Sequence, residues 1–520
     1  MSTAPGSLIG KLEQAFVELD PTVQTALLAG AATAAGYKVY KVLAGPDYSG
    51  IPAVGASGAL SSYADARAFE QHAKEIIQEG VVKYPGSVFR VPTMDGWMVV
   101  VSGHQLVDEL RAAREDELSF REAVEEVIHM KYTMGTTMEH HSEHLKIVQS
   151  DVTRNIGHCF ADIYDEVQAV FSDVITCKEG EEWCTVPGFM TTMAMVSRVS
   201  NRYFVGLPLC RDKDFIASNM QFAIDVFQAA VKIRKYPAWL RPLIGNYLAP
   251  YKNQRKYISG HIGAFVAQRI AEDDKYGKDR EDRPVDLISW ILNHTPTELR
   301  TVEDVVLRVM SFNFAAIHTS TNTFANVLFH LAAEPDKYLQ PLRDEVEEVV
   351  AKHGWTKTAM REMYKLDSFL RESGRFNGLG CFSMTRKVVK KGGYTFSDGT
   401  KVPEGAMVGV ASHATHWREE NYKDAHVFDG FRFSRMREAD KTKYQMVNTD
   451  CEFLLFGHGY HACPGRFFAA NELKAMLAHL VLYYGVQLEG GSRVKPENEW
   501  NTTSASPSRT AKVMFRKRQQ

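Results

Sequence analysis

The sequence predicts a mainly α-helical protein with a smaller β region, and two kinds of segment carry this prediction. Apolar residues recur with mostly helical spacing from 105 to 269, and a longer uninterrupted helical pattern runs from 301 to 333. Two short apolar segments, 88–92 and 97–101, flank an Asp-Gly turn at 95–96, as the two strands of a hairpin do. The chain therefore combines many helices with a few strands.

Composition places the chain among ordinary globular proteins. It has 520 residues, of which 45% are hydrophobic and 24% are charged, and its formal net charge is −2. Such a chain can bury a large core, and its near-neutral charge gives no sign of nucleic-acid binding. Seven cysteines, an odd and sparse number, argue against a disulfide framework and favour a reducing compartment.

The first 44 residues form a separate N-terminal segment. Residues 21–37 carry no charge, but these seventeen residues fall just short of the ~18–20 that a membrane-spanning helix needs. We expect an anchor at about 21–43, which either spans the membrane or lies on its surface as an amphipathic helix. Because Lys38 and Lys41 follow the uncharged stretch, the positive-inside rule places the rest of the chain on the cytosolic side.

The remaining chain, residues 45–520, is predicted to form a single domain. It begins with a turn-rich hinge at 45–52, and no internal repeat or later break divides it. In its C-terminal half, the apolar segments 394–396 and 406–410 flank a Ser-Asp-Gly turn, which predicts a second hairpin.

The pattern from 301 to 333 predicts one long helix. Thr301 can cap its N-terminus, acidic residues occupy its first turn, and Pro335 follows its end. At ~1.5 Å per residue this helix is roughly 50 Å long. It carries no charged residue from 309 to 333, yet polar side chains near its middle make exposure to lipid costly. Such a helix is better placed through a protein core, beside a cofactor.

The most specific motif is the stretch from Phe456 to Gly465, which reads F-x-x-G-x-x-x-C-x-G and precedes an apolar, helix-forming segment. Gly459 and Gly465 permit a tight turn with positive φ and a close approach of the backbone to a bulky group. Pro464 suits the first turn of the following helix, and the helix dipole favours a thiolate at Cys463. We predict that Cys463 forms a single axial bond to the metal of a flat apolar cofactor.

Two other interpretations of this cysteine compete with a cofactor ligand. A lone cysteine in a glycine-rich turn is usually a small buried hydrophobic side chain. A zinc site fails on spacing, because the closest cysteine is Cys451 and the chain has no C-x-x-C pair. The ten-residue pattern is far more specific than a lone cysteine, and it favours the cofactor ligand.

This pattern resembles the heme-binding loop of the cytochrome P-450 family, the heme-thiolate monooxygenases, and the resemblance extends from about residue 50 to the end of the chain. It implies a heme b whose proximal ligand is Cys463. The residues that the family implies around the heme are Phe456, Gly459, Gly465, His461 and Arg386, the last two as partners of the heme propionates. His461, where many members carry arginine, resembles the fungal variant. The W-x-x-x-R motif of many members is absent, and His144 in its region is interpreted as a solvated or capping residue.

The centre of the long helix, Ala315 to Ser320, resembles the oxygen-activation motif of that family, A/G-G-x-D/E-T-T/S. The resemblance implies that Thr319 hydrogen-bonds dioxygen and passes protons. His318 stands where the motif has an acid. It either takes over proton delivery, since its ordinary pKa of about 6.5 suits this task, or only packs against a neighbouring helix.

A second motif of the family lies between the long helix and the cysteine loop. Glu372 and Arg375 form an E-x-x-R pair, which puts both on one helical face. The stretch 428–433 resembles the segment whose arginine, here Arg432, joins that pair. One carboxylate held by two guanidiniums forms several charge-assisted hydrogen bonds. We interpret this network as a structural brace for the segment before the cysteine loop, not as a catalytic group.

Together these motifs predict a heme-thiolate monooxygenase that inserts one oxygen atom of dioxygen into a bulky apolar substrate. The motifs resemble those of fungal members in secondary metabolism, which favours a terpenoid or sterol-like molecule. The predicted substrate pocket is mainly apolar and consists of Phe312, Ala315, Ala316, Asn377, Leu379 and Phe382.

The chain has no flavin or nicotinamide fingerprint, so electrons must come from another protein. The family implies a separate NADPH-cytochrome reductase, with cytochrome b5 as a second donor, at the endoplasmic reticulum membrane with the catalytic domain facing the cytosol. Two alternatives stay open: a heme-thiolate isomerase or dehydratase that uses no dioxygen, and a non-catalytic heme-binding protein. His318 lends the first some weight, whereas neither explains Thr319.

Overall fold

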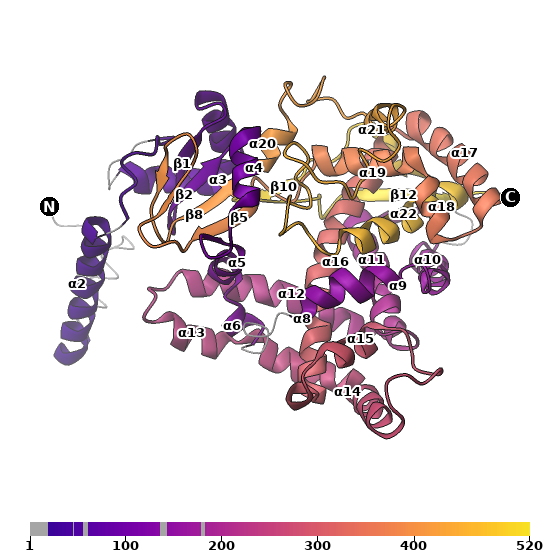
Figure 1. The fold of residues 1–520 in the computed structure, drawn as a ribbon, viewed down its shortest axis with the longest axis horizontal. Coiled ribbons are helices and arrows are strands. Elements are labelled where there is room, and N and C mark those ends of the chain that lie inside the picture. Colours follow the sequence, from indigo (N-terminus) through magenta and orange to yellow (C-terminus); the bar gives the residue numbers. More distant parts are fainter. Residues whose placement is uncertain (1–18, 45, 56–60, 136–142, 178–181, 520) are drawn as a thin grey trace.

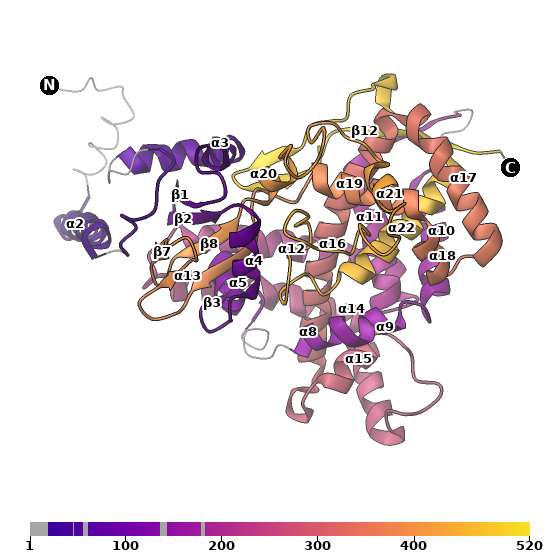
Figure 2. The same cartoon turned by 45° about the horizontal axis from the view of Figure 1, so that its top comes forward.

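The computed structural model describes residues 19–44, 46–55, 61–135, 143–177 and 182–519. As predicted, it is mainly helical with a smaller sheet region. The larger sheet and the N-terminal part of the chain lie at one end, and most helices form the other end (Figure 1). Helix α2 (Pro21–Ala44) projects from the sheet end, whereas α16 (Val302–Ala333) runs through the helical part (Figure 1 and Figure 2).

The stretch predicted to be mostly helical is confirmed as a series of helices joined by turns. The helices before α16 are α3 (Ser61–Lys83), α4 (His104–Ala112), α5 (Phe120–Ile128), α6 (Met130–Thr133), α8 (Glu143–Ile147), α9 (Thr153–Asn155), α10 (Phe160–Val174), α11 (Gly188–Phe204), α12 (Lys213–Arg234), α13 (Arg241–Leu248), α14 (Pro250–Tyr276) and α15 (Leu287–His294). Those after it are α17 (Pro335–His353), α18 (Lys357–Glu362), α19 (Tyr364–Phe376), α20 (Ser412–His416), α21 (Arg432–Met436) and α22 (Arg466–Tyr483). Shorter turns are the π-helix η1 (Val148–Val152) and the 3₁₀ turns η2 (Leu209–Arg211), η3 (Thr297–Leu299) and η4 (Glu489–Gly491).

The strands of the described residues form four small sheets. The largest has the order β1-β2-β8-β5-β3 and consists of β1 (Val88–Thr93), β2 (Gly96–Val101), β3 (Leu118–Ser119), β5 (Ser383–Val388) and β8 (Met407–Val410). The others are β4-β12-β9 (Cys184–Pro187, Lys512–Lys517, Tyr484–Leu488), β10-β11 (Glu499–Asn501, Ser504–Ser506) and β6-β7 (Tyr394–Thr395, Lys401–Val402). The first predicted hairpin is confirmed, because β1 and β2 are antiparallel with Thr93 opposite Gly96.

The second predicted hairpin is wrong about its pairing. The strand at 394–395 pairs with β7, and the segment at 407–410 instead forms β8 in the middle of the larger sheet. There β8 runs parallel to β2, with Val100 opposite Gly409. Three of the four residues of β8 are buried. An apolar strand buries more of its surface between two neighbouring strands than in a two-stranded hairpin, so the central position is favoured.

Helix α16 is confirmed almost residue for residue. The Thr301 hydroxyl accepts a hydrogen bond from the Asp304 N–H at 3.2 Å, so it caps the N-terminus as predicted, and the helix ends at Ala333. Both halves of the helix lie in the main hydrophobic core, where Val309 and Phe324 are fully buried. It packs against α11, α12, α14, α19 and α22, and these contacts hold its middle in the interior.

Two findings concern the remaining expectations about the chain. Among the residues that the structure describes, no helix is both long and apolar enough to cross a membrane. Cys177 and Cys184 form a disulfide with Cα atoms 4.5 Å apart, and the other five cysteines are free. A single bridge is not a framework, but this pair departs from the expectation of reduced cysteines.

Candidate active site

Cys463 lies in a tight loop that leads into α22. The Cys463 N–H donates a hydrogen bond to the Phe456 carbonyl oxygen at 2.8 Å, which closes the loop. Gly459 has φ 82°, and a Cβ at this position would come within 2.0 Å of Arg111 Cγ on α4. The loop therefore requires glycine here for both its backbone conformation and its packing, as predicted.

The start of α22 differs slightly from the prediction. The helix begins at Arg466 with Gly465 as its N-cap, so Pro464 precedes the helix and does not occupy its first turn. Gly465 has φ −80°, which any residue can adopt. A Cβ at Gly465 would lie 3.9 Å from Cys463 Sγ, an ordinary contact, so neither backbone conformation nor a clash requires glycine here.

The Cys463 side chain is exposed, although protein surrounds it. Burial raises the pKa of its thiol, and the backbone N–H groups of Gly465 and Arg466 and the charge of Arg466 only partly oppose this. The predicted stabilisation of the thiolate by the helix N-terminus is thus present but is outweighed by desolvation. An open sulfur in desolvating surroundings lines an internal space, and a metal cation there would supply the charge that ionises the thiol.

The middle of α16 also opens onto an internal space. Ala315 and Thr319 are exposed and Ala316 is half-buried, whereas Val309 and Phe324 on either side are fully buried. Ala315 and Thr319 are four residues apart and share one face, and the Thr319 hydroxyl donates to the Ala315 carbonyl oxygen at 2.8 Å. Ser320, the residue after Thr319, hydrogen-bonds to Glu472 on α22, so this stretch of α16 lies beside the helix that follows the cysteine loop.

Two basic side chains meet at the phenyl ring of Phe120, the first residue of α5. The Arg386 guanidinium lies 5.4 Å from the ring centroid, and the His461 ring lies 5.3 Å from it. Arg386 is only 2% exposed and has no carboxylate partner among the described residues. Its Nη1 donates to the Thr385 carbonyl oxygen at 2.8 Å, and burial lowers its pKa to about 10. A buried guanidinium in this state is prepared to bind an anion.

His461 has an acidic partner that the sequence did not reveal. Its Nε2 lies 3.0 Å from Glu115 Oε2, and Glu115 in turn accepts hydrogen bonds from the Ser119 hydroxyl and from two backbone N–H groups of α5. Burial and the nearby Arg386 charge lower the pKa of His461, while Glu115 opposes that change. No local signal marks Glu115, since it lies 346 positions away in sequence from the histidine that it contacts.

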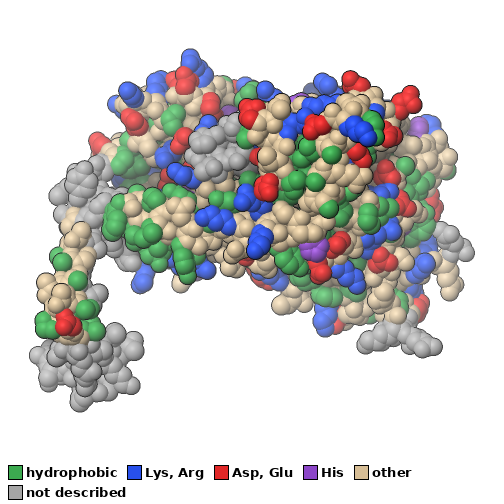
Figure 3. Space-filling model, turned by 90° about the horizontal axis from the view of Figure 1, so that it is seen from below, with side chains coloured by type: hydrophobic (Ala, Val, Ile, Leu, Met, Phe, Trp, Pro, Cys, Tyr) green, Lys and Arg blue, Asp and Glu red, His purple; other side chains and the backbone are tan. Residues whose placement is uncertain are grey.

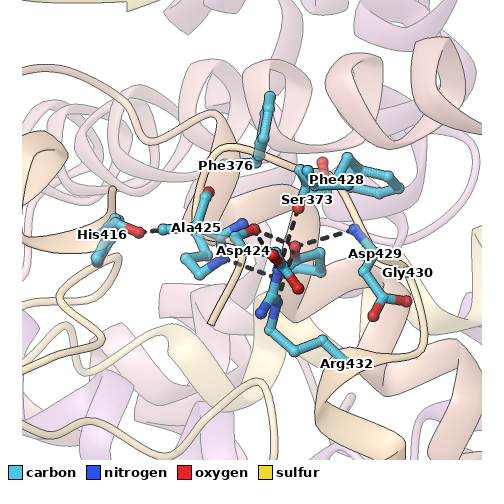
Figure 4. Close-up of polar contacts among 12 residues, drawn as sticks. Ser373, Phe376, His416, Asp424, Ala425, Phe428, Asp429, Gly430 and Arg432 are labelled. Carbon is cyan, nitrogen blue, oxygen red and sulfur yellow. Dashed lines mark hydrogen bonds and ion pairs between the residues drawn. The ribbon is translucent and has the colours of Figure 1, made fainter. Parts of the chain in front are cut away.

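The predicted network of one carboxylate and two guanidiniums forms. Arg375 donates from Nε and Nη2 to the two oxygens of Glu372, both at 2.8 Å, and Arg432 Nε lies 3.2 Å from Glu372 Oε1. Glu372 and Arg375 are fully buried. Figure 4 shows Arg432, Asp429 and His416 in this network: the Asp429 N–H donates to the Glu372 carboxylate, and the His416 carbonyl oxygen accepts from Arg375. The network joins α19 to the segment that precedes the cysteine loop.

Comparison with known proteins identifies the family. The description Cytochrome P450 matches residues 63–515. Cytochrome P450 monooxygenase 71 of Postia placenta is 42% identical over 472 residues, which cover 90% of this chain and 93% of that protein. Cytochrome P450 monooxygenase CYP512U6 of Ganoderma lucidum is 32% identical, with 90% and 92% covered, and Cytochrome P450 monooxygenase olcJ of Penicillium canescens is 31% identical, with 82% and 80% covered.

The chain belongs to the cytochrome P450 family. It is therefore a heme-thiolate monooxygenase, an oxidoreductase that incorporates molecular oxygen and works with a redox partner. The residues of this P450 fit a heme on three observations: the open sulfur of Cys463, the open stretch of small residues on α16, and the buried guanidinium of Arg386, which has no carboxylate in salt-bridge distance among the described residues. A flat apolar ring with two carboxylates requires these three features.

His318 does not face the open side of α16. Its Nε2 lies 3.4 Å from the Met220 carbonyl oxygen on α12, and burial lowers its pKa. Of the two predicted roles, this geometry favours packing against a neighbouring helix over proton delivery.

The residues of the predicted substrate pocket fall into two groups. Ala315 and Ala316 lie on the open face of α16 beside Thr319. Phe312 is packed against Phe204 in the core, and the Asn377 amide lies 2.6 Å from His330 Nε2. The others, Leu379 and Phe382, are half-buried, and Phe382 packs against the core beneath the larger sheet. Only the two alanines are thus brought next to Thr319 on one open face.

Sequence reasoning missed Glu472, an acid on α22 that is only 1% exposed. Its Oε1 accepts a hydrogen bond from the Ser200 hydroxyl of α11 at 2.6 Å, and Ser320 of α16 hydrogen-bonds to it as well. Burial raises its pKa to about 8, and Oε2 has no hydrogen-bond partner in the described part of the chain. A signal was available, since an acidic residue inside a mainly apolar, buried helical stretch is unusual.

Proposed function

We propose that this P450 inserts one oxygen atom of dioxygen into a bulky apolar molecule of the terpenoid or sterol-like class, with Cys463 as the axial thiolate ligand of the heme. Two observations together carry this proposal: the exposed sulfur of Cys463 just before α22, and the open, small-residue face of α16, whose Ser320 hydrogen-bonds to Glu472 on α22. A side chain larger than alanine at 315 would fill the space that a substrate needs beside Thr319.

In this proposal, each end of the heme pocket has a separate task. Arg386 binds one propionate with its buried guanidinium, and His461 donates a ring N–H to the other while Glu115 orients the ring. Phe456, Gly459 and Gly465 shape the loop so that the Cys463 sulfur stays open. The Glu372, Arg375 and Arg432 network holds the preceding segment in place without touching the reacting groups.

Thiolate-ligated heme, when bound, supplies the reductive activation of dioxygen, which consumes protons in a site closed to bulk water. The Thr319 hydroxyl lies on the open face of α16 and can hold a proton donor there. Glu472 is a buried acid near Thr319, because it hydrogen-bonds to Ser320, the next residue of α16. A pKa of about 8 keeps its carboxyl protonated at neutral pH, so we assign the proton store to Glu472 and the packing role to His318.

The proposal includes a membrane and an NADPH-cytochrome reductase, with cytochrome b5 as a second donor. Trp239, Leu243 and Tyr247 in and before α13 are large apolar side chains that are 69%, 68% and 87% exposed. Figure 1 places α13 on the same side of the molecule as α2, and in the view from below hydrophobic side chains gather on the body beside the projecting helix (Figure 3). We assign this face and α2 to the cytosolic surface of the endoplasmic reticulum, where amphipathic aromatic residues are favoured.

The ligand assignment is tested by the reduced carbonyl complex. We expect purified enzyme to show the long-wavelength band of thiolate-ligated heme, and Cys463→His to lose that band while still binding heme. Cys159→Ser, a change at a free cysteine outside the loop, is the matched control and should keep the band. A band that persists in Cys463→His would overturn the assignment.

The substrate class is tested in a fungal strain that lacks this protein. Mass spectrometry of its extracts should reveal an accumulated apolar precursor that lacks one oxygen atom relative to the wild-type product. The purified enzyme with an NADPH-cytochrome reductase should then convert that precursor and consume NADPH and dioxygen. An accumulated precursor that is highly charged, or that is converted without NADPH, would contradict the proposal.

A further inference from the structure

Outside the heme site, three side chains with metal-binding atoms converge where α4 meets the cysteine loop. Asp108 comes from α4, Cys451 from the segment before the loop, and His458 from the loop itself. One carboxylate oxygen, the sulfur and one ring nitrogen all lie within 4.8 Å of one another. Donors on one tetrahedral zinc ion are roughly 3.3–3.8 Å apart, so small side-chain rotations bring all three onto a single ion.

We propose that Asp108, Cys451 and His458 form a binding site for a divalent transition-metal ion, with Zn²⁺ as the best-matched ion. A thiolate, an imidazole and a carboxylate form a donor set that zinc prefers, whereas calcium and magnesium require oxygen donors. Three protein ligands leave a fourth position for water.

The immediate surroundings of the three ligands support this assignment. His458 Nδ1 lies 3.1 Å from the Thr449 hydroxyl, and this hydrogen bond holds the ring in place. Cys451 is only 5% exposed, so a bound ion would be shielded from competing solutes. Two further carboxylates, Asp450 and Glu452, flank the cysteine in sequence, and Asp450 lies 3.4 Å from the Arg371 guanidinium.

Binding requires two changes at the site. Burial and the charge of Asp108 raise the pKa of Cys451 to about 11, so the thiol loses its proton to solvent as its sulfur binds the metal. Asp108 must also release Arg111, whose Nε lies 2.7 Å from Asp108 Oδ1. This ion pair is 37% and 46% exposed and therefore weak, so a divalent ion can displace it. The side chain of His104 also lies close to Asp108 and His458.

The experiment uses heme-loaded enzyme and Zn²⁺ in competition with a chromophoric chelator. We expect one Zn²⁺ per chain with release of a proton, measured in weakly buffered solution. Cys451→Ser and His458→Gln should each weaken binding at least about tenfold. Cys159→Ser is the matched control, because it removes another buried free thiol that does not lie in the cluster, and it should bind as the wild type does.

Arg111→Met supplies a variant that gains affinity. It keeps the apolar stem that packs on Gly459 but removes the charge that competes for Asp108. The affinity of this variant for Zn²⁺ should rise about twofold to fivefold, which corresponds to the loss of one exposed ion pair that competes for Asp108. The reduced carbonyl band must survive the addition of Zn²⁺. The proposal is overturned if Zn²⁺ abolishes that band by taking Cys463, if Cys451→Ser binds as tightly as wild type, or if no proton is released.

Discussion

Replacing Glu472 by glutamine should make the stability of the enzyme less dependent on pH. The wild-type carboxyl is fully buried, and its pKa rises from the usual 4.5 to about 8. Between these values the unfolded chain loses the proton and the folded chain keeps it, so the folded state binds more protons and its stability falls as pH rises. Glutamine has the same shape and forms neutral hydrogen bonds with Ser200 and Ser320, but it does not titrate.

The magnitude follows from the two pKa values. The difference between 8 and 4.5 is about 3.5, and each tenfold change in proton affinity corresponds to about 1.4 kcal/mol, so the loss approaches about 5 kcal/mol at pH 8. The stabilisation by glutamine relative to glutamate should therefore grow from pH 5 to pH 8 and then remain constant. No discount for solvent screening applies, because the group is only 1% exposed.

The assay is the thermal unfolding midpoint of heme-loaded wild type and Glu472→Gln from pH 5 to pH 9. At pH 8 the variant should unfold several degrees above the wild type, and at pH 5 the two should be close. Glu438→Gln, at an exposed position of the chain segment after α21, is the matched control and should show no pH-dependent difference. A constant difference between wild type and Glu472→Gln across this range would refute a protonated, buried Glu472.

Three further predictions concern other parts of the molecule. Glu372→Ala leaves two buried guanidiniums without their carboxylate, which costs roughly 3–5 kcal/mol, so the yield of heme-loaded protein should collapse; normal yield and turnover would contradict a buried network. Thr319→Ala should raise the peroxide released per NADPH consumed. His318→Phe should keep the wild-type coupling and pH dependence of turnover, because the His318 ring contacts α12. Slowed turnover with a flattened pH profile between about 6 and 8 in His318→Phe would instead support a proton-relay role for His318. The two glycosylation sequons, at Asn293 and Asn501, should both remain unmodified if the catalytic domain faces the cytosol. A change in electrophoretic mobility after endoglycosidase treatment of the native protein would contradict this topology.

The sequence by itself determined the features that depend on neighbouring residues. The cap at Thr301 and the end of the long helix at Ala333 follow from side chains within one turn of each terminus, and the structure matches both. The turn at Gly459 and the pairing of Glu372 with Arg375 are likewise set within a few positions of the chain. Local spacing is sufficient here, because the atoms that interact are adjacent along the backbone.

Only the tertiary structure decided the contacts between distant segments. It paired His461 with Glu115, placed β8 between β2 and β5, and turned His318 toward α12 and away from the open face of α16. It also buried Glu472 beside Ser320, at a place that no motif marks. The physical reason is desolvation, which governs both the pKa of a buried acid and the choice of strand partner. Desolvation depends on all the groups packed around a residue, and these groups come together only when the chain is folded.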